Sequence, residues 1–405
     1  MAGSLLEAET EAPAKTEQPK NDKANKLNML VDFIQTRYKI FYNEMELDYY
    51  LNDILENKLE KLDKDLLAYI LADNGFTGFK DLLNPIIKTL GRNNNFHPIK
   101  AYFEHIHEKP YNPEKEPDYI GKLCEHIELK DNREMSLFKK HFMYMLVRSI
   151  KQVFLDHYFN KQAFILLSSA QNIGKSSFFR YLIPNGLESY YSEDFNIDKD
   201  GKIAICTNWI INIDEMSALS KFDIRQLKAF MSKDSIKERL PYDAKATKNK
   251  RTANFVGTTN DIELLSDPTG SVRFIIFEIE KINFNYSQTI DVDNIWRQAY
   301  YLFDSNNRRY AELTKEDIHE NEERNKKYTV RTPEMELLMK YFKPSSKEKG
   351  QFMMTSEMYK HIMDKTSYAH KLNPINLGKA LAFYKFTRDK EGDRYGYYVM
   401  ETGEI

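Results

Sequence analysis

The stretch AFILLSSAQNIGKSSFFRYLI, residues 163–183, decides the fold of this chain. Its opening run is continuously apolar, which is typical of a buried parallel strand. A polar loop follows and ends in Gly174, Lys175 and Ser176, and apolar residues at helical spacing resume from Phe178. Strand, loop and helix in this order are the setting in which the ending of G-x-x-x-x-G-K-[ST] binds phosphate.

The residue types of this loop suit a nucleotide. Backbone N–H groups at the start of a helix surround phosphate oxygens, and Gly174 lets the backbone approach them closely. Lys175 would neutralise the β- and γ-phosphates, and Ser176 would ligate Mg²⁺, so we expect ATP and Mg²⁺ as cofactors. The alternative is a chance GKS in a turn, and Ser169, which stands where the motif has its first glycine, slightly favours that alternative. The expected nucleotide-binding residues are Ser169, Ala170, Gln171, Asn172, Ile173, Gly174, Lys175, Ser176 and Ser177.

Three further apolar runs repeat the strand pattern: WIINID (209–214), ANFVGTT (253–259) and RFIIFEI (273–279). Helical or polar segments separate them. Short apolar strands that alternate with helices indicate an α/β fold, a sheet with both faces covered.

Asp214 and Glu215 follow the second of these strands, about 40 residues after the phosphate loop. Two adjacent carboxylates at a strand end are costly unless a cation lies beside them. With a phosphate loop nearby, Asp214 would support Mg²⁺ together with Ser176, and Glu215 would orient and polarise the attacking water. A solvated turn is the alternative for this pair taken by itself.

Asn260 and Arg273 mark the next two strands. Asn260 comes directly after an apolar strand, where it would contact a γ-phosphate or the water, or else cap a turn. Arg273 stands at the edge of a strand, after a glycine turn, where it would reach a phosphate across a subunit boundary, or else pair with Asp267 on the surface. Lys175, Asp214, Glu215, Asn260 and Arg273 form the expected catalytic set.

A basic segment, residues 233–251, lies between Glu215 and Asn260. It has seven Lys or Arg and three acidic residues, hence a net charge of +4. Lys245, Lys248 and Lys250 would hold a single-stranded DNA backbone through sequence-tolerant, salt-sensitive contacts. A solvated charged face is the alternative.

Composition limits the class of protein. The chain has 405 residues, a net charge of −2, 41% hydrophobic and 30% charged residues, and two cysteines. These values exclude a wholly disordered chain, a disulfide scaffold and a four-cysteine zinc site. No apolar run approaches the length of a membrane span, and the N-terminus lacks a signal-peptide pattern, so a cytoplasmic protein without membrane contact is expected.

The chain divides into four parts by pattern. Residues 1–25 lack aromatics and are expected to be a disordered tail. Residues 26–150 are expected to be an N-terminal helical domain, and residues 151–330 a phosphate-loop ATPase domain. Residues 331–405 predict two short helices and a hairpin, which resembles a winged helix.

Seven segments, in this order, resemble the virulence-associated protein E family. They are HPIKAYF (97–103), MLVRSIKQVF (145–154), QNIGKSSF, NIDEM, ERLPY, RTANFVGTTN and TGSVRF. The family's members are AAA+ ATPases related to superfamily 3 helicases and to phage and plasmid primase–helicases.

The resemblance implies an α/β AAA+ core assembled as a ring, usually a homohexamer, with ATP at subunit interfaces. It assigns the loop to nucleotide, Asp214 and Glu215 to the second motif, Asn260 to the sensor and Arg273 to a trans-acting finger. Val272 replaces the first arginine of the family's usual pair, so Arg251 is the alternative finger. Relatives also place DNA-contacting or ring-coupling residues at the positions of Arg239, Tyr242 and Arg251. No primase domain is evident before the ATPase, so a separate primase or replication partner is expected.

Three hypotheses follow. The first is an ATP-driven, ring-forming DNA helicase or translocase of a mobile element. The second is a nucleotide-switched assembly protein, for replication or for defence, whose winged helix binds a DNA site. Lys385, Arg388, Lys390 and Arg394 would make that contact, and a solvated wing is the favoured alternative for these four residues. The third is a small-molecule kinase, which Glu215, Asn260 and the ring-type arginine argue against. DNA-stimulated hydrolysis separates the first from the second.

Overall fold

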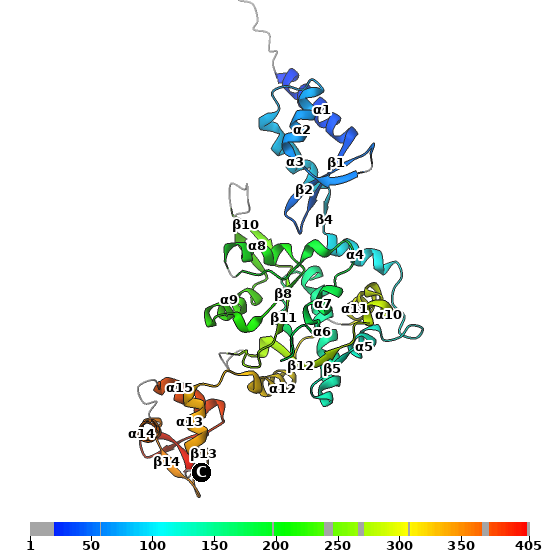
Figure 1. Ribbon diagram of the computed structural model, residues 1–405. Coiled ribbons are helices and arrows are strands. Elements are labelled where there is room, and N and C mark those ends of the chain that lie inside the picture. Colours follow the sequence, from blue (N-terminus) through cyan, green and yellow to red (C-terminus); the bar gives the residue numbers. More distant parts are fainter. Residues whose placement is uncertain are drawn as a thin grey trace, which may run out of the picture. The chain divides into compact units, whose positions relative to one another are not determined.

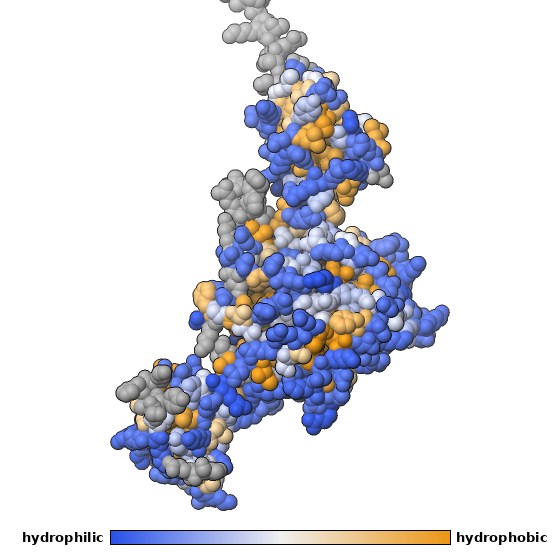
Figure 2. Space-filling model, in the orientation of Figure 1, coloured by the Kyte–Doolittle hydropathy of each residue, from blue (hydrophilic) through white to orange (hydrophobic). Residues whose placement is uncertain are grey.

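A computed structural model of the protein describes residues 20–56, 58–196, 198–238, 246–265, 271–306, 308–366 and 372–402 (Figure 1). The chain forms two compact units, Met1–Tyr102 and Phe103–Ile405. None of the described helices is long and apolar enough to cross a membrane. On the face that Figure 2 presents, hydrophilic residues cover most of the second unit, and apolar side chains occur in small groups.

The first unit contains a sheet, which the predicted N-terminal helical domain did not include. A four-stranded sheet of order β3-β2-β1-β4 packs with three helices. Aromatic and β-branched residues in YKIFYN, the sequence of β1, favour a pleated strand, and pairing with β2 completes its hydrogen bonds. The elements are α1 (Lys20–Arg37), β1 (Tyr38–Asn43), β2 (Asp48–Asp53), β3 (Lys58–Lys61), α2 (Lys64–Asp73), α3 (Lys80–Asn93) and β4 (Asn95–Phe96).

The first helix also corrects the expected tail. Residues 20–25 belong to α1, so the predicted disorder over 1–25 ends too late. The remainder of that tail, residues 1–19, lies outside the described residues. Helix α4 (Pro98–His107) follows β4 and runs into the second unit.

The second unit is built on a six-stranded sheet of order β5-β12-β6-β11-β8-β7. β6 (Ala163–Leu167), β8 (Ile210–Ile213), β11 (Asn254–Thr259) and β12 (Phe274–Ile282) are the four strands that the apolar runs predicted. They pair in parallel, and β7 (Tyr191–Ser192) continues the parallel order beside β8. β5 (Ile127–Leu129) is an antiparallel edge strand on β12. The α/β prediction is therefore confirmed at the level of a mixed fold with a parallel sheet.

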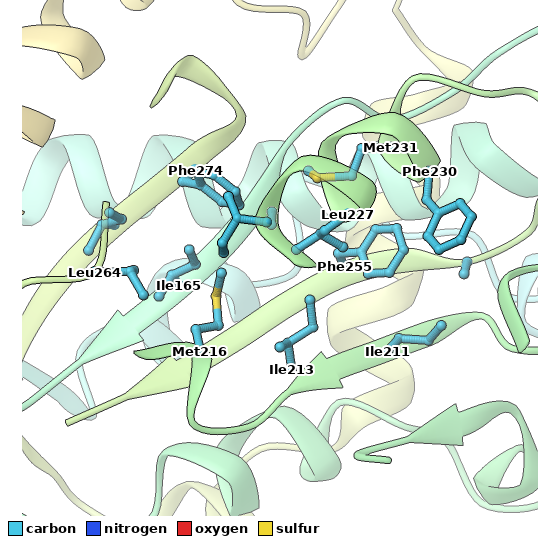
Figure 3. Close-up of a cluster of buried hydrophobic side chains, with 14 of the residues drawn as sticks. Ile165, Ile211, Ile213, Met216, Leu227, Phe230, Met231, Phe255, Leu264 and Phe274 are labelled. Atoms are coloured by element: carbon cyan, nitrogen blue, oxygen red, sulfur yellow. The ribbon is translucent and has the colours of Figure 1, made fainter. Parts of the chain in front are cut away.

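Helices cover both faces of this sheet. On one face, side chains of β6, β8, β11 and β12 pack against α9 (Lys221–Met231), and Figure 3 shows the Phe255 ring beside Leu227 and Phe230. On the other face, the rings of Phe138 and Phe142, from α6 (Met135–Phe154), lie 5.5 and 5.7 Å from the ring of Phe164. Neighbouring residues of β6 point to opposite faces, so an entirely apolar strand is buried on both sides.

The remaining elements of the Phe103–Asn325 region carry the loops of the site. They are α5 (Tyr119–Cys124), η1 (Asn132–Glu134), α7 (Lys175–Tyr181), η2 (Glu188–Tyr190), α8 (Lys199–Thr207), η3 (Met216–Ala218), β9 (Ser235–Glu238), β10 (Thr247–Lys250), η4 (Ser271–Arg273), α10 (Tyr286–Thr289), α11 (Val292–Asp304) and α12 (Lys315–Asn325).

The C-terminal part has a hydrophobic core of its own, with buried residues such as Leu338, Met358 and Leu381. Helices α14 and α15 and the β15–β16 hairpin occupy the stretches in which two helices and a hairpin were expected. The elements are η5 (Lys326–Tyr328), α13 (Pro333–Tyr341), β13 (Phe342–Pro344), β14 (Gln351–Met353), α14 (Thr355–Lys365), α15 (Pro374–Phe383), β15 (Arg388–Glu391) and β16 (Arg394–Glu401).

Candidate functional site

The loop between β6 and α7 turns sharply at two left-handed residues. Asn172 has φ +57° and Gly174 has φ +88°. Asparagine tolerates this region and glycine adopts it freely, so both residue types suit the turn. Ser169 is not among the described residues with positive φ, so serine is accommodated there without left-handed strain.

Lys175 is buried at the first position of α7. Its Nζ donates to Asn260 Oδ1 at 2.6 Å and lies 3.5 Å from the carbonyl oxygen of Ala170. Burial lowers the pKa of the ammonium, and the Asp214 carboxylate partly offsets that effect. The loop and the end of β11, far apart in sequence, thus meet at this lysine.

Asp214 joins the same group from the end of β8. Its Oδ1 accepts a hydrogen bond from Ser176 Oγ at 3.1 Å and another from Thr258 Oγ1. Sequence reasoning missed Thr258, although it stands two residues before Asn260 in the predicted strand. A hydroxyl and a carboxylate this close are the hard oxygen ligands that Mg²⁺ prefers.

Glu215 is exposed and has a left-handed backbone, with φ +50°. This conformation is strained for a glutamate. Below it, Met216 is buried against β11, and a Cβ added to Gly257 would lie 2.5 Å from the Met216 sulfur. The glycine therefore makes room for the turn that presents Glu215.

These side chains line one cavity of about 390 Å³ at the carboxyl ends of β6, β8 and β11. Ser169 and Ala170 do not line it, although the sequence placed them in the nucleotide loop. Its lining is Gln171, Asn172, Ile173, Gly174, Lys175, Ser176, Ser177, Asp214, Glu215, Thr258, Thr259 and Asn260. Carboxyl ends of parallel strands are where ligands bind in open α/β sheets.

Metal binding at this cavity would depend on few protein groups. Across the described part of the chain, no three His, Cys, Asp or Glu side chains converge into a ready-made metal cluster. Mg²⁺ commonly takes one or two protein oxygens and completes its shell with water and phosphate. The Ser176 hydroxyl and the Asp214 carboxylate fit that mode of binding.

Arg273 lies at the amino ends of the strands, whereas the cavity lies at their carboxyl ends. It immediately precedes β12, whose Phe274 pairs with Ala163 at the start of β6, whereas the loop follows the end of β6. The four steps along β6 from Ala163 to Leu167 therefore separate the start of β12 from the phosphate loop by about 13 Å. The guanidinium contacts Ser232 Oγ at 3.3 Å and does not line the cavity of its own chain.

The predicted DNA-contacting residues differ in their exposure and in whether the structure describes them. Lys248 is exposed on the hairpin formed by β9 and β10, directly opposite the exposed Lys237. Lys250 is partly exposed and donates to the carbonyl oxygen of Val153 at 2.9 Å. Arg239, Tyr242 and Lys245 lie outside the described residues.

The position of Arg251 contradicts both predicted roles, the DNA contact and the alternative trans-acting finger. The side chain is fully buried, and its guanidinium donates to Phe230 O at 2.8 Å, to Asn160 O at 2.7 Å and to Gln152 Oε1 at 3.0 Å. Burial lowers the pKa of Arg251 to about 10, which leaves it charged at neutral pH. Arg251 holds α6, α9 and the start of β11 together and cannot reach DNA or a neighbouring nucleotide.

The sequence profile of the virulence-associated protein E-like domain matches residues 120–330, just over half of the chain. The chain belongs to the virulence-associated protein E-like family. The matched domain contains the cavity, the β9–β10 hairpin and Arg273, whereas α13 and everything after it lie beyond the match.

Solved structures that resemble this chain are only distantly similar in sequence. The apo structure of the NrS-1 C terminal region (305-718) is 12% identical, with 93% of this chain and 99% of that chain covered and a TM-score of 0.47. The A form of the same region is 12% identical over 88% and 86% of the two chains, with a TM-score of 0.42. Similarity at these TM-scores does not establish a shared function. No curated protein matches the chain.

Proposed function

We propose that the protein is an ATP-dependent, ring-forming DNA helicase or translocase of the superfamily 3 type, encoded by a phage, plasmid or other mobile element. The observation that carries this proposal is the meeting of Lys175, Ser176, Asp214, Glu215 and Asn260 around one cavity. These residues come from three strand ends and one helix start. Such a set of groups suits binding and hydrolysis of a nucleoside triphosphate.

In the proposed mechanism, the loop at 169–177 and Lys175 hold the phosphates of ATP. Ser176 and Asp214 would hold Mg²⁺, which would neutralise phosphate charge there. Glu215 orients the attacking water and accepts its proton. Asn260 Oδ1 accepts a hydrogen bond from Lys175 Nζ at 2.6 Å, so a γ-phosphate would compete for the same lysine and would couple the nucleotide site to the end of β11.

The β9–β10 hairpin is the proposed DNA contact. Lys237 and Lys248 face each other across it, and like charges directly opposite one another are destabilising unless an anion lies between or beside them. A phosphate backbone supplies such an anion. Contacts of this kind carry no sequence information, as a translocase requires.

Ring assembly would supply Arg273 to a neighbour. Because Arg273 lies at the opposite end of the strands from the cavity of its own chain, it would contact the nucleotide bound by a second copy of the chain. A head-to-tail interface that closes into a ring joins unlike faces in this manner. We propose a homohexamer, with a separate primase or replication partner.

The C-terminal part is proposed to be a winged helix appended to an AAA+ phosphate-loop core. Its order α13-β13-β14-α14-α15-β15-β16 supports this assignment. The second candidate function, a nucleotide-switched assembly protein that binds a DNA site, draws on this part. There, the Arg388 guanidinium and the Lys390 ammonium lie 4.7 and 5.6 Å from the centre of the Tyr395 ring, on an exposed hairpin.

The test is ATP hydrolysis with and without single-stranded DNA. We expect DNA to stimulate turnover, and Glu215→Gln to bind ATP and fail to hydrolyse it. Glu280→Gln, an exposed control outside the cavity, should leave turnover unchanged. Hydrolysis that ignores DNA would favour the assembly switch, and normal turnover in Glu215→Gln would refute the assigned water-orienting role.

A further inference from the structure

A second cavity, of about 790 Å³, lies next to the phosphate cavity. Its walls come from two stretches that the sheet brings together, residues 125–139 around β5 and residues 281–285, which comprise the end of β12 and the segment after it. Ile127, Met135, Ile282 and Phe284 supply apolar surface. Neither stretch belongs to the residues that hold phosphate.

Phe284 connects the second cavity to the phosphate loop. A Cβ built on Gly174 would lie 2.4 Å from Phe284 Cε1, so the ring occupies the space that any larger residue at 174 would fill. Gly174 lines the phosphate cavity, whereas Phe284 lines the second one. The Phe284 side chain is nevertheless 52% exposed, which leaves ring surface for a ligand.

The segment after β12 is fastened to the helix that follows the phosphate loop. The ring of Tyr286 lies 5.6 Å from that of Phe178 and 4.8 Å from that of Tyr181, both on α7. Tyr181 also donates a hydrogen bond to the carbonyl oxygen of Ile290. The second cavity is therefore held in a fixed position relative to the loop.

The phosphate cavity lacks what a nucleoside needs. Its lining is almost entirely polar, and Ile173 is the single large aliphatic side chain among the residues that form it. Nucleobases stack on aromatic or apolar faces, and ligand pockets combine such faces with a few placed polar groups.

The second cavity has those properties. Asn132, Asn283 and Asn285 carry amides at its surface, and asparagine amides pair with adenine edges. Its charged side chains are two lysines and two glutamates, and Lys139 pairs with Glu125 at 3.1 Å. This balance suits an uncharged base and sugar and offers little to a phosphate.

We propose that this cavity is the subsite for the adenine base and ribose of the nucleotide, with the base stacked on Phe284. The inference rests on the proposed function, because it requires a triphosphate in the loop at 169–177. The Phe284 ring would then contact the phosphate loop at Gly174 and stack on the adenine base.

The test compares Mg-ATP with Mg-tripolyphosphate, which has the phosphates and no base, by isothermal titration calorimetry on the full chain. Phe284→Ala should weaken ATP binding roughly tenfold or more, since base stacking on an aromatic ring is lost. Tripolyphosphate affinity should stay within about twofold of that of the wild type, because that ligand makes no stacking contact. Phe284→Trp should restore ATP binding, and Phe222→Ala, which removes a similarly exposed ring from α9, should change neither ligand.

Two results would overturn the subsite. Phe284→Ala that binds ATP like the wild type would mean that the base lies elsewhere. Equal losses for ATP and tripolyphosphate would mean that Phe284 only shapes the loop. If the wild type binds neither ligand, the proposed function fails first and the inference falls with it, which is a different outcome from both. Thermal melting of each variant checks that it is folded.

Discussion

At the scale of single residues, Arg251 shows how burial decides a role. In KNKR the three basic residues look alike, yet Lys248 is exposed and Arg251 is fully buried. A guanidinium that donates to three oxygens inside the protein stabilises the packing of α6 against α9. A sequence gives the charge of a side chain without its exposure, so this distinction could not be predicted.

Arg251→Met should therefore destabilise the protein and should not act through DNA. It removes the donor to Asn160 O and one of the donors to Phe230 O and to Gln152 Oε1, which keep hydrogen bonds from Lys233 N and Asn160 N. We expect a loss of about 2 kcal/mol or more in unfolding free energy. Chemical denaturation measures this loss. Lys248→Met is the control and should cost little stability. Unchanged stability of Arg251→Met would contradict the assigned role.

Gly257 makes a second prediction at this scale. In Gly257→Ala, the new Cβ would press on the Met216 sulfur and displace the turn that carries Glu215. We expect turnover of ATP to fall roughly tenfold or more while binding is kept, because small displacements of catalytic groups are costly. Gly378→Ala is the matched control, since nothing lies within 4 Å of its added Cβ. Equal turnover in both variants would show that Met216 yields without moving Glu215.

His141, on α6, links stability to pH. Burial, and then the nearby charges of Arg148 and Arg324, lower its pKa from 6.5 to about 3. Between these values the unfolded chain binds a proton that the folded chain does not, so stability falls as pH falls below about 6.5. At pH 5.5 this loss amounts to about 1.4 kcal/mol.

Thermal unfolding at pH 7.5 and pH 5.5 tests the contribution of His141. The decrease in stability should be smaller in His141→Phe, which has no group to protonate and keeps an aromatic ring beside Phe277. His319→Asn, on the exposed side of α12, should keep the wild-type decrease. A His141→Phe variant that follows the wild type at both pH values would remove this residue from the account.

At the scale of elements, the central strands could be predicted and the N-terminal sheet could not. AFILL and NFVGTT are buried on both faces, so their apolar runs are visible in the sequence. β1 to β3 mix aromatic, charged and amide residues, and β3 is exposed along its whole length. Pairing between neighbouring strands creates that sheet, and pairing is not written in the periodicity of any one of them.

The same difference applies to the candidate site. Gly174, Lys175, Asp214 and Asn260 were found because each stands directly after a predicted strand or before a predicted helix. Thr258 was missed because it lies within a strand and its role depends on the distance to Asp214 across the sheet.

The β9–β10 hairpin provides the prediction at this scale. Lys237→Ala/Lys248→Ala should weaken single-stranded DNA binding and reduce the slope of log affinity against log salt by about 1.4, since each phosphate contact contributes about 0.7. Fluorescence anisotropy across a salt series measures the slope. Lys109→Ala/Lys122→Ala, two exposed lysines elsewhere, should leave it unchanged. An unaltered slope in the hairpin variant would return these lysines to an ordinary solvated face.

At the scale of the whole molecule, the proposed role of Arg273 requires a neighbouring copy of the chain. Glu215→Gln and Arg273→Ala should each abolish hydrolysis alone, because every interface lacks one group. Mixed in equal amounts, about a quarter of the interfaces would join an intact Glu215 to an intact Arg273 from the next copy. Turnover should then recover to about that fraction of the wild-type value.

The mixing experiment has its own control. Glu215→Gln mixed with a Glu215→Gln/Arg273→Ala double variant should stay inactive, because no interface has both groups. If the first mixture is also inactive although mixed assemblies form, Arg273 does not act across subunits.

The left-handed backbone at Glu215 has a consequence for engineering. Glycine would relax this turn, and replacing a strained residue commonly raises the melting temperature. A selection for heat resistance would therefore reward the loss of the very side chain that is proposed to activate water. Stability and turnover are in conflict at this position, and a search for a more robust variant of this protein should hold residue 215 fixed from the start.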